Sequence, residues 1–350
     1  MHHFLCFRAG KTLNKKSRIH MSTLRCLASC LKAHKNTGII KSSLRKLQQL
    51  FLFCVNFNGY LAIRKTLCSP GLCCIMRHNP RTPFKFVGNY ISLSLSCTSR
   101  LSMLLHHYRF IDTHYVTAFS SDLLKEQINL WETQRVDDTY TVGLTISDHD
   151  LEGDLSLVLK RNMQKVYVLS FTVVPGEIIQ GSGHTLFVSR IQGIKNPDIV
   201  RTATKALGDV SPPMILLTAA RAIAMASGIS CLAGVSSATQ ITVGEEDSPE
   251  QGCYFNYDEF WHSKGGLRMD NGLFRLSVAP HSKPDDAITG KHRTRTLRKR
   301  RFSDELLEKC REKFELTYLK KAETEAVKTS WSMHVATPLV ALVTEALTIC

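Results

Sequence analysis

Hydrophobic and polar residues alternate along the middle of the chain. In four ranges, apolar side chains fall at every second position or in short runs rich in β-branched and aromatic residues, a pattern typical of β-strands. These ranges are 140–146, 153–160, 166–174 and 185–191. Because short turns separate them, we expect an antiparallel meander, with Gly181-Ser182-Gly183 as a turn between the last two strands.

Helical spacing predominates on both sides of these strands. Helices are expected at 84–131, 198–207, 214–227 and 303–328, and further strands at 231–235 and 272–278. N-terminal helices, an antiparallel sheet, and then helices with returning strands indicate an α+β fold.

Changes in composition and proline content divide the chain into three parts. Residues 1–78 are basic and are expected to be mostly helical or poorly ordered, residues 79–320 form the α+β domain, and residues 321–350 form a C-terminal extension. Pro80 and Pro83 lie close to the first boundary.

Positive charge is concentrated at two places in a chain whose formal net charge is +15. No Asp or Glu precedes Asp112, and residues 1–111 hold 18 lysines and arginines. A second basic run consists of Lys291, Arg293, Arg295, Arg298, Lys299, Arg300 and Arg301. Such stretches attract polyanions, among them anionic lipid, lipopolysaccharide and nucleic acid; a solvated basic face is the alternative.

The sequence predicts no cleaved signal peptide, because polar residues interrupt every apolar run in residues 1–30. Residues 214–235 are long enough to span a bilayer, but Arg221 lies within them and Gly228 and Gly234 favour a buried helix followed by a strand. The twelve cysteines are irregularly spaced without a CxxC pair, so we expect reduced thiols and no metal site. The expected location is the cytoplasm or the inner face of the membrane.

Common nucleotide-binding, zinc-protease and hydrolase motifs are missing from the sequence: GxxxxGK[ST], HExxH and GxSxG do not occur. One possible ligand site is Gln192-Gly193, which ends a strand before the helix that carries Thr204-Lys205. This arrangement is similar to that of acyl-CoA N-acyltransferases, in which a helix N-terminus holds pyrophosphate. A tight strand–helix turn is the alternative.

A second possible site contains Asp258, Trp261 and Gly265-Gly266. A tryptophan beside a double glycine can form a pocket wall or an interaction surface, although core packing explains Trp261 equally well. Glu152, at the start of a strand, is the best candidate for a catalytic general base, but the sequence shows no partner for it.

Several short motifs, taken in order, resemble the VirK/YbjX family of Gram-negative bacteria. They are Asn79–Pro83, Tyr90, Arg100-Leu101, His107-Tyr108, Glu152–Leu157, Leu169–Phe171, Ile191–Gly193, Thr204–Gly208, Tyr257–Trp261, Gly265-Gly266 and the basic run, and together they cover about residues 79–315. The chain departs from the family after Trp261, where His262, Ser263 and Lys264 replace an acidic residue and a leucine. The resemblance implies association with virulence, envelope remodelling and resistance to cationic antimicrobial peptides, without a defined reaction.

We therefore expect an accessory protein of envelope homeostasis whose basic N-terminal region attaches to anionic lipid. One alternative is an acyl-CoA-dependent N-acyltransferase-like enzyme that binds its cofactor near Gln192-Gly193, with Glu152 as base. A further alternative is nucleic-acid binding through the basic run. The sequence does not decide whether the protein is an enzyme.

Overall fold

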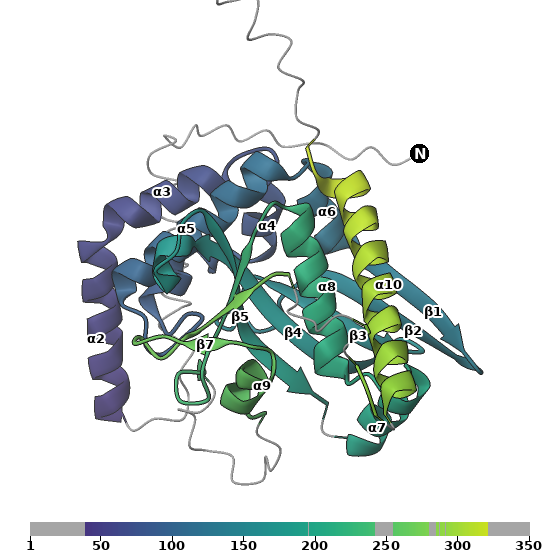
Figure 1. The fold of residues 1–350 in the computed structure, drawn as a ribbon. Coiled ribbons are helices and arrows are strands. Elements are labelled where there is room, and N and C mark those ends of the chain that lie inside the picture. Colours follow the sequence, from purple (N-terminus) through teal and green to yellow (C-terminus); the bar gives the residue numbers. More distant parts are fainter. Residues whose placement is uncertain are drawn as a thin grey trace, which may run out of the picture. The chain divides into compact units, whose positions relative to one another are not determined.

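A β-sheet lies at the centre of the computed structural model, which describes residues 39–194, 196–241, 255–279, 285–286, 288–290 and 292–320 (Figure 1). Within these residues the strands are β1 (Ile128–Arg135), β2 (Asp138–Ile146), β3 (Leu155–Arg161), β4 (Gln164–Pro175), β5 (His184–Gly193), β6 (Cys231–Gly234), β7 (Leu267–Arg268) and β8 (Phe274–Ser277). They form one sheet in the order β1-β2-β3-β4-β5-β6-β8-β7. The expected antiparallel meander is confirmed for β1 to β5, whereas β6 pairs with β5 in parallel.

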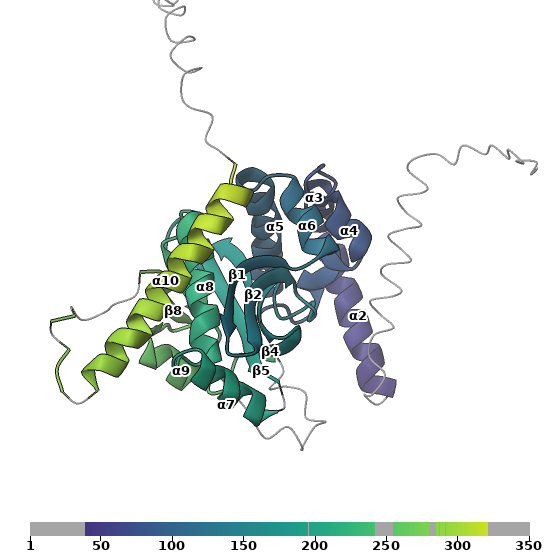
Figure 2. The ribbon, with the colours of Figure 1, turned by 90° about the vertical axis from the view of Figure 1, so that its right-hand side faces the viewer.

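Helices cover both faces of the sheet. They are α2 (Ile39–Val55), α3 (Phe57–Leu67), α4 (Cys73–His78), α5 (Cys97–His114), α6 (Ala118–Lys125), α7 (Pro197–Ala206), α8 (Pro212–Ala226), α9 (Tyr257–Ser263) and α10 (Arg293–Tyr318), with the 3-10 segments η1 (Thr82–Val87) and η2 (Gly176–Ile179). Figure 2 shows the sheet between α8 and α10 on one side and α5 and α6 on the other. The expected α+β class is confirmed.

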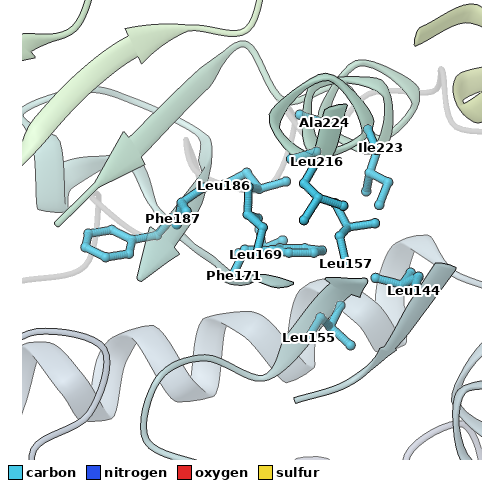
Figure 3. Close-up of a cluster of buried hydrophobic side chains, with 14 of the residues drawn as sticks. Leu144, Leu155, Leu157, Leu169, Phe171, Leu186, Phe187, Leu216, Ile223 and Ala224 are labelled. Carbon is cyan, nitrogen blue, oxygen red and sulfur yellow. The ribbon is translucent and has the colours of Figure 1, made fainter. Parts of the chain in front are cut away.

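The main core lies between the sheet and α8. Leu157, Leu169 and Leu186 point from neighbouring strands toward Leu216 and Ile223 of the helix (Figure 3), and all five side chains are at most 1% exposed. The range 214–235 is thus a buried helix and strand, as predicted. No helix of the described residues is long and apolar enough to cross a membrane.

The helices between residues 39 and 78 contribute to the same hydrophobic core as the sheet. Tyr60, Ile63 and Leu67 of α3 are at most 2% exposed, and the Phe53 ring of α2 lies 5.6 Å from that of Phe84 in η1. The described part of residues 1–78 therefore packs with the residues that follow it. Residues 1–38 and 321–350 lie outside the described residues.

Two predicted helices have different bounds in the structure. The range 84–131 is not continuously helical, because it contains η1, α5, α6 and the start of β1. Because of a bulge between Asn129 and Trp131, the consecutive residues Leu130 and Trp131 are both buried. This interrupts the alternation of apolar and polar positions that would identify the strand. Helix α10 begins at Arg293 rather than at Ser303, so the basic run lies on the helix itself.

Strand β5 continues beyond the end of β6. Their parallel pairing runs from Thr185 and Cys231 to Val188 and Gly234. The register between β4 and β5 shifts at the same point, which makes Ser189 an extra residue on β5. Bulges of this kind twist a strand and often occur beside functional sites. The polar residues described next surround this point.

Candidate functional site

Two buried carboxylates flank a glycine immediately before β3. Glu152 is 4% exposed and Asp154 is 3% exposed. Gly153 between them has a φ of +132°, and a Cβ atom at this position would lie 3.1 Å from the backbone nitrogen of Phe171 and from the Ser189 hydroxyl. The site therefore requires glycine for both its backbone conformation and the close approach of β4 and β5.

Glu152 receives its partners from distant parts of the chain. The Gln240 amide donates a hydrogen bond of 2.9 Å to Oε1, and Arg190 Nη1 lies 3.1 Å from Oε2. Arg190 also donates through Nε to the Gln192 side chain at 2.9 Å. Oε2 is enclosed and accepts no hydrogen bond from the described residues, so the contact with Arg190 is electrostatic. The free lone pairs of Oε2 could accept a hydrogen bond or a proton from a small group that reached them.

Tyr257 completes the Glu152 cluster, which we define as Glu152, Arg190, Gln192, Gln240 and Tyr257. Its hydroxyl accepts a hydrogen bond of 3.0 Å from the Ile191 N–H and lies 3.3 Å from the Ile191 carbonyl, to which it donates. It thus satisfies the backbone of β5 where β6 no longer pairs. Burial raises the pKa of Tyr257, so its hydroxyl stays protonated and can donate.

His149 lies at the solvent side of Glu152. Its Nδ1 atom is 3.8 Å from Oε2 of Glu152, and its side chain is 55% exposed. Burial and the nearby Arg190 charge lower the pKa of His149. His149 is therefore neutral at physiological pH, and Arg190 provides the positive charge that faces Glu152.

Asp154 is the centre of a separate buried network. Its carboxylate accepts hydrogen bonds from Lys85 at 3.0 Å, from Tyr108 at 2.9 Å, from Thr172 at 3.0 Å and from the Tyr90 hydroxyl. Burial alone would raise the pKa of Asp154, but the Lys85 ammonium and these hydrogen bonds hold it well below its usual range. Burial and the Asp154 charge raise the pKa of both tyrosines, which therefore remain donors.

His107 lies beside this network. Its Nδ1 atom accepts a hydrogen bond of 3.2 Å from the Val173 N–H, which places the imidazole proton on Nε2. Burial lowers the pKa of His107 to about 4, so the ring is neutral at pH 7. A cavity of about 10 Å³, lined by His107, Tyr108 and Asp154 with apolar side chains, is the size of a single water. We interpret the Asp154 network as structural, because no substrate fits there.

The residues expected near a cofactor do not converge on one ligand. Gln192 belongs to the Glu152 cluster, but Gly193 packs against Tyr167, whose ring would lie 2.6 Å from an added Cβ atom. On α7, the Thr204 hydroxyl donates to the Val200 carbonyl at 2.8 Å, and Lys205 is exposed. Each of these contacts has a structural explanation within the chain.

The aromatic segment around α9 is largely a packing element. Trp261 is fully buried and donates a hydrogen bond of 2.8 Å to the Val235 carbonyl. Added Cβ atoms on Gly234 and Gly266 would lie 2.3 Å and 2.9 Å from atoms of Trp261, so both glycines make room for it. Gly265 has a φ of +75° and faces open space, and Asp258 accepts a hydrogen bond of 2.9 Å from the Ser237 N–H.

The basic run forms the first three turns of α10, except Lys291, which lies outside the described residues. Arg295 and Arg298 lie 3.2 Å and 3.3 Å from the same carboxylate oxygen of Asp209. Arg300 pairs with Asp285 at 2.8 Å. Arg293 and Arg301 are exposed, Lys299 is half-buried, and the run keeps a positive excess on the protein surface.

Sequence reasoning missed most of the residues that surround Glu152 and Asp154. The resemblance pointed to Tyr90, Tyr108 and the Glu152–Leu157 motif, but gave no reason to connect them. Arg190 and Gln240 lacked any local signal, because each reaches Glu152 through the fold. Among the described residues, no group of three or more His, Cys, Asp or Glu side chains is placed to hold a metal ion.

The fold and the buried clusters define an α+β protein with a helix-covered mixed sheet, and sequence comparison places it in a family. The model of a family described as "Protein of unknown function (DUF535)" matches residues 40–315, and the chain belongs to this family. It is similar to the uncharacterized protein YbjX of Escherichia coli (strain K12), with 26% identity over 242 residues that cover 67% of this chain and 72% of the relative. The expected membership of the VirK/YbjX family is thus confirmed. No solved structure matches the chain.

Proposed function

We propose that this protein is an accessory factor of bacterial envelope homeostasis that attaches to the inner membrane from the cytoplasm. Through this role it would contribute to virulence and to resistance against cationic antimicrobial peptides, as the family resemblance implies. One observation carries the attachment: an exposed apolar helix face in the acid-free part of the chain.

This face lies on α2. Leu47, Leu50, Phe51, Cys54 and Val55 follow the spacing of one helix face, and Leu47, Phe51 and Val55 are 63%, 67% and 65% exposed. On the opposite side of the helix, Phe53 packs against Tyr60 and Phe84. Because the inner side is fixed to the core, α2 would lie along a membrane with its outer face at the lipid boundary.

The charge around this face favours an anionic bilayer over other partners. No Asp or Glu precedes Asp112, while Lys46 lies on α2 itself and Arg64 and Lys65 lie on the adjacent helix α3, where Lys65 is exposed. Each basic residue held close to an anionic membrane contributes about 1 kcal/mol, and each buried large apolar side chain about 2 kcal/mol. Together these contributions would support reversible binding.

The test is co-sedimentation of the full chain with vesicles that contain phosphatidylglycerol, compared with pure phosphatidylcholine. Phe51→Asp should weaken binding to anionic vesicles at least tenfold, because it replaces an inserting ring with a charge. Leu316→Asp is the matched control, since Leu316 is 76% exposed but lies on α10. Deletion of residues 1–78 is unsuitable, because it would also remove core residues of α3.

Several results would overturn the attachment. Equal binding of Phe51→Asp and Leu316→Asp would remove α2 from the interface. If the chain forms concentration-dependent dimers and Phe51→Asp abolishes them, the apolar face of α2 binds a second copy of the chain instead of a membrane. Salt-sensitive binding to nucleic acid without vesicle binding would favour the alternative based on the basic run of α10.

The acyl-CoA alternative is supported by the position of the Glu152 cluster. Ligands of open sheets bind beyond the carboxyl ends of parallel strands, and the cluster lies where β5 continues past β6. Acetyl-CoA or a longer thioester at about 100 times its dissociation constant should raise the unfolding free energy by about 2.7 kcal/mol. Gln192→Ala should reduce this effect; no response to any thioester would exclude this alternative.

A further inference from the structure

A buried arginine on α8 lacks a counter-charge. Arg221 is 6% exposed, and its Nε atom is fully enclosed. Within the part of the chain that the structure describes, this Nε atom makes no hydrogen bond, and no carboxylate pairs with the Arg221 side chain. Burying an ion without a partner is unfavourable, and arginine cannot avoid the cost by losing its proton at ordinary pH. Burial nevertheless lowers the pKa of Arg221, which reflects how poorly the charge is solvated.

A second cation lies within electrostatic reach of Arg221. Lys264 follows directly after α9, which lies beside α8 in both ribbon views (Figures 1 and 2). It is half-buried, and its Nζ atom is 5.7 Å from the centroid of the Phe260 ring. Burial and the Arg221 charge lower the pKa of Lys264. Among the described residues no carboxylate pairs with either side chain, so neither positive charge is neutralised.

The face of α8 that carries Arg221 leads to the protein surface. Met214, Thr218, Arg221 and Met225 lie on one face of α8, and Met225 is 41% exposed, so this face reaches the surface about one turn beyond Arg221. Next to Lys264, the space that a Cβ atom on Gly265 would enter is open.

We propose that Arg221 and Lys264 bind a phosphate group. A guanidinium offers paired donors that match two phosphate oxygens, and an ammonium adds a compact positive charge. A phosphate monoester carries nearly two negative charges at pH 7, which would neutralise both cations. This site does not depend on membrane attachment, because it lies on α8 and α9 rather than on α2.

The experiment is thermal unfolding of the full chain at constant ionic strength with sodium chloride, inorganic phosphate or pyrophosphate. Phosphate should raise the Tm of the wild-type chain by at least about 2 °C, and Arg221→Met and Lys264→Met should abolish the rise. In phosphate-free buffer, Arg221→Met should raise the Tm, because methionine fills the same space without an unpaired charge. Arg100→Met is the matched control, since Arg100 also has an enclosed Nε without a hydrogen-bond partner, and it should keep the phosphate response.

Three results would overturn the proposal: no response of the wild-type chain to phosphate or pyrophosphate, an equal response in Arg221→Met and Lys264→Met, or loss of the response in Arg100→Met. Isothermal titration with pyrophosphate provides a second measurement on Lys264→Met, whose half-exposed position makes misfolding a minor concern. Coenzyme A and short-chain phosphatidic acid then distinguish the source of the phosphate. A rise in Tm with either compound that is lost in Arg221→Met supports the site. A rise with coenzyme A indicates a soluble cofactor, and a rise with phosphatidic acid indicates a lipid headgroup.

Discussion

Lys85 and Asp154 form an ion pair that is almost completely removed from solvent. The Lys85 ammonium lies 3.0 Å from Oδ1 of Asp154, and the two side chains are 5% and 2% exposed. The pair links η1 to the start of β3 and is completed by hydroxyl donors from α5 and β4. It therefore connects η1, α5 and the sheet at one point.

Breaking this pair should be costly. Lys85→Met leaves a buried carboxylate without its counter-ion, so we expect a loss of about 3–5 kcal/mol in the free energy of unfolding. Denaturation by urea, monitored by circular dichroism, measures this loss. Lys165→Met is the control, because the Lys165–Asp148 pair is 50% and 65% exposed and should contribute at most about 1 kcal/mol. Equal losses in the two variants would contradict a special role for the buried pair.

His107 should make the protein sensitive to acid. Its pKa is about 4 in the folded state, below the usual value of 6.5. Between these values the unfolded chain binds a proton that the folded chain does not, so stability falls as pH decreases from 6.5 to 4. In His107→Gln, the slope of unfolding free energy against pH should decrease by about 1.4 kcal/mol per pH unit in this window. An unchanged slope would show that His107 takes up its proton equally in both states.

Gly153 should tolerate no side chain. Gly153→Ala combines a left-handed backbone with a Cβ atom 3.1 Å from the Phe171 nitrogen, and should destabilise the protein by about 2–4 kcal/mol. Gly208→Ala isolates the backbone effect, since Gly208 has a φ of +71° with open space around it, and should cost about 1 kcal/mol. Thermal or chemical unfolding of both variants measures the difference. Similar losses would mean that β4 and β5 can move away from Gly153.

Tyr257→Phe tests the hydroxyl that binds the end of β5. The change would leave the buried Ile191 N–H and carbonyl without their shared partner, which should cost about 1–3 kcal/mol. Amide hydrogen exchange should accelerate at Ile191 more than at Leu169, its neighbour on β4. Uniform acceleration across β4 and β5 would indicate global destabilisation instead.

Local sequence patterns predicted the fold better than they predicted the clusters. Strands β2 to β5 alternate clearly or carry many β-branched residues, and their short turns allow only nearby pairing. The bulge at Asn129 removed this signal from β1, and the basic start of α10 has little apolar periodicity. Glu152 was identified from its position, but its partners Arg190 and Gln240 are brought to it by the bulge in β5 and by the segment after β6. Such contacts depend on tertiary structure and have no local pattern.

The mixed pairing of β5 also determines the order in which the sheet can assemble. Strands β1 to β5 join neighbours in sequence through short connections, so their ladders close small loops and can form rapidly. Strand β6 reaches β5 only after α7 and α8 have been placed, and β7 and β8 follow it. The entropy of closing this larger loop makes the β5–β6 contact a late step. The Glu152 cluster, which needs residues from both sides of that contact, would then be among the last parts of the molecule to become ordered.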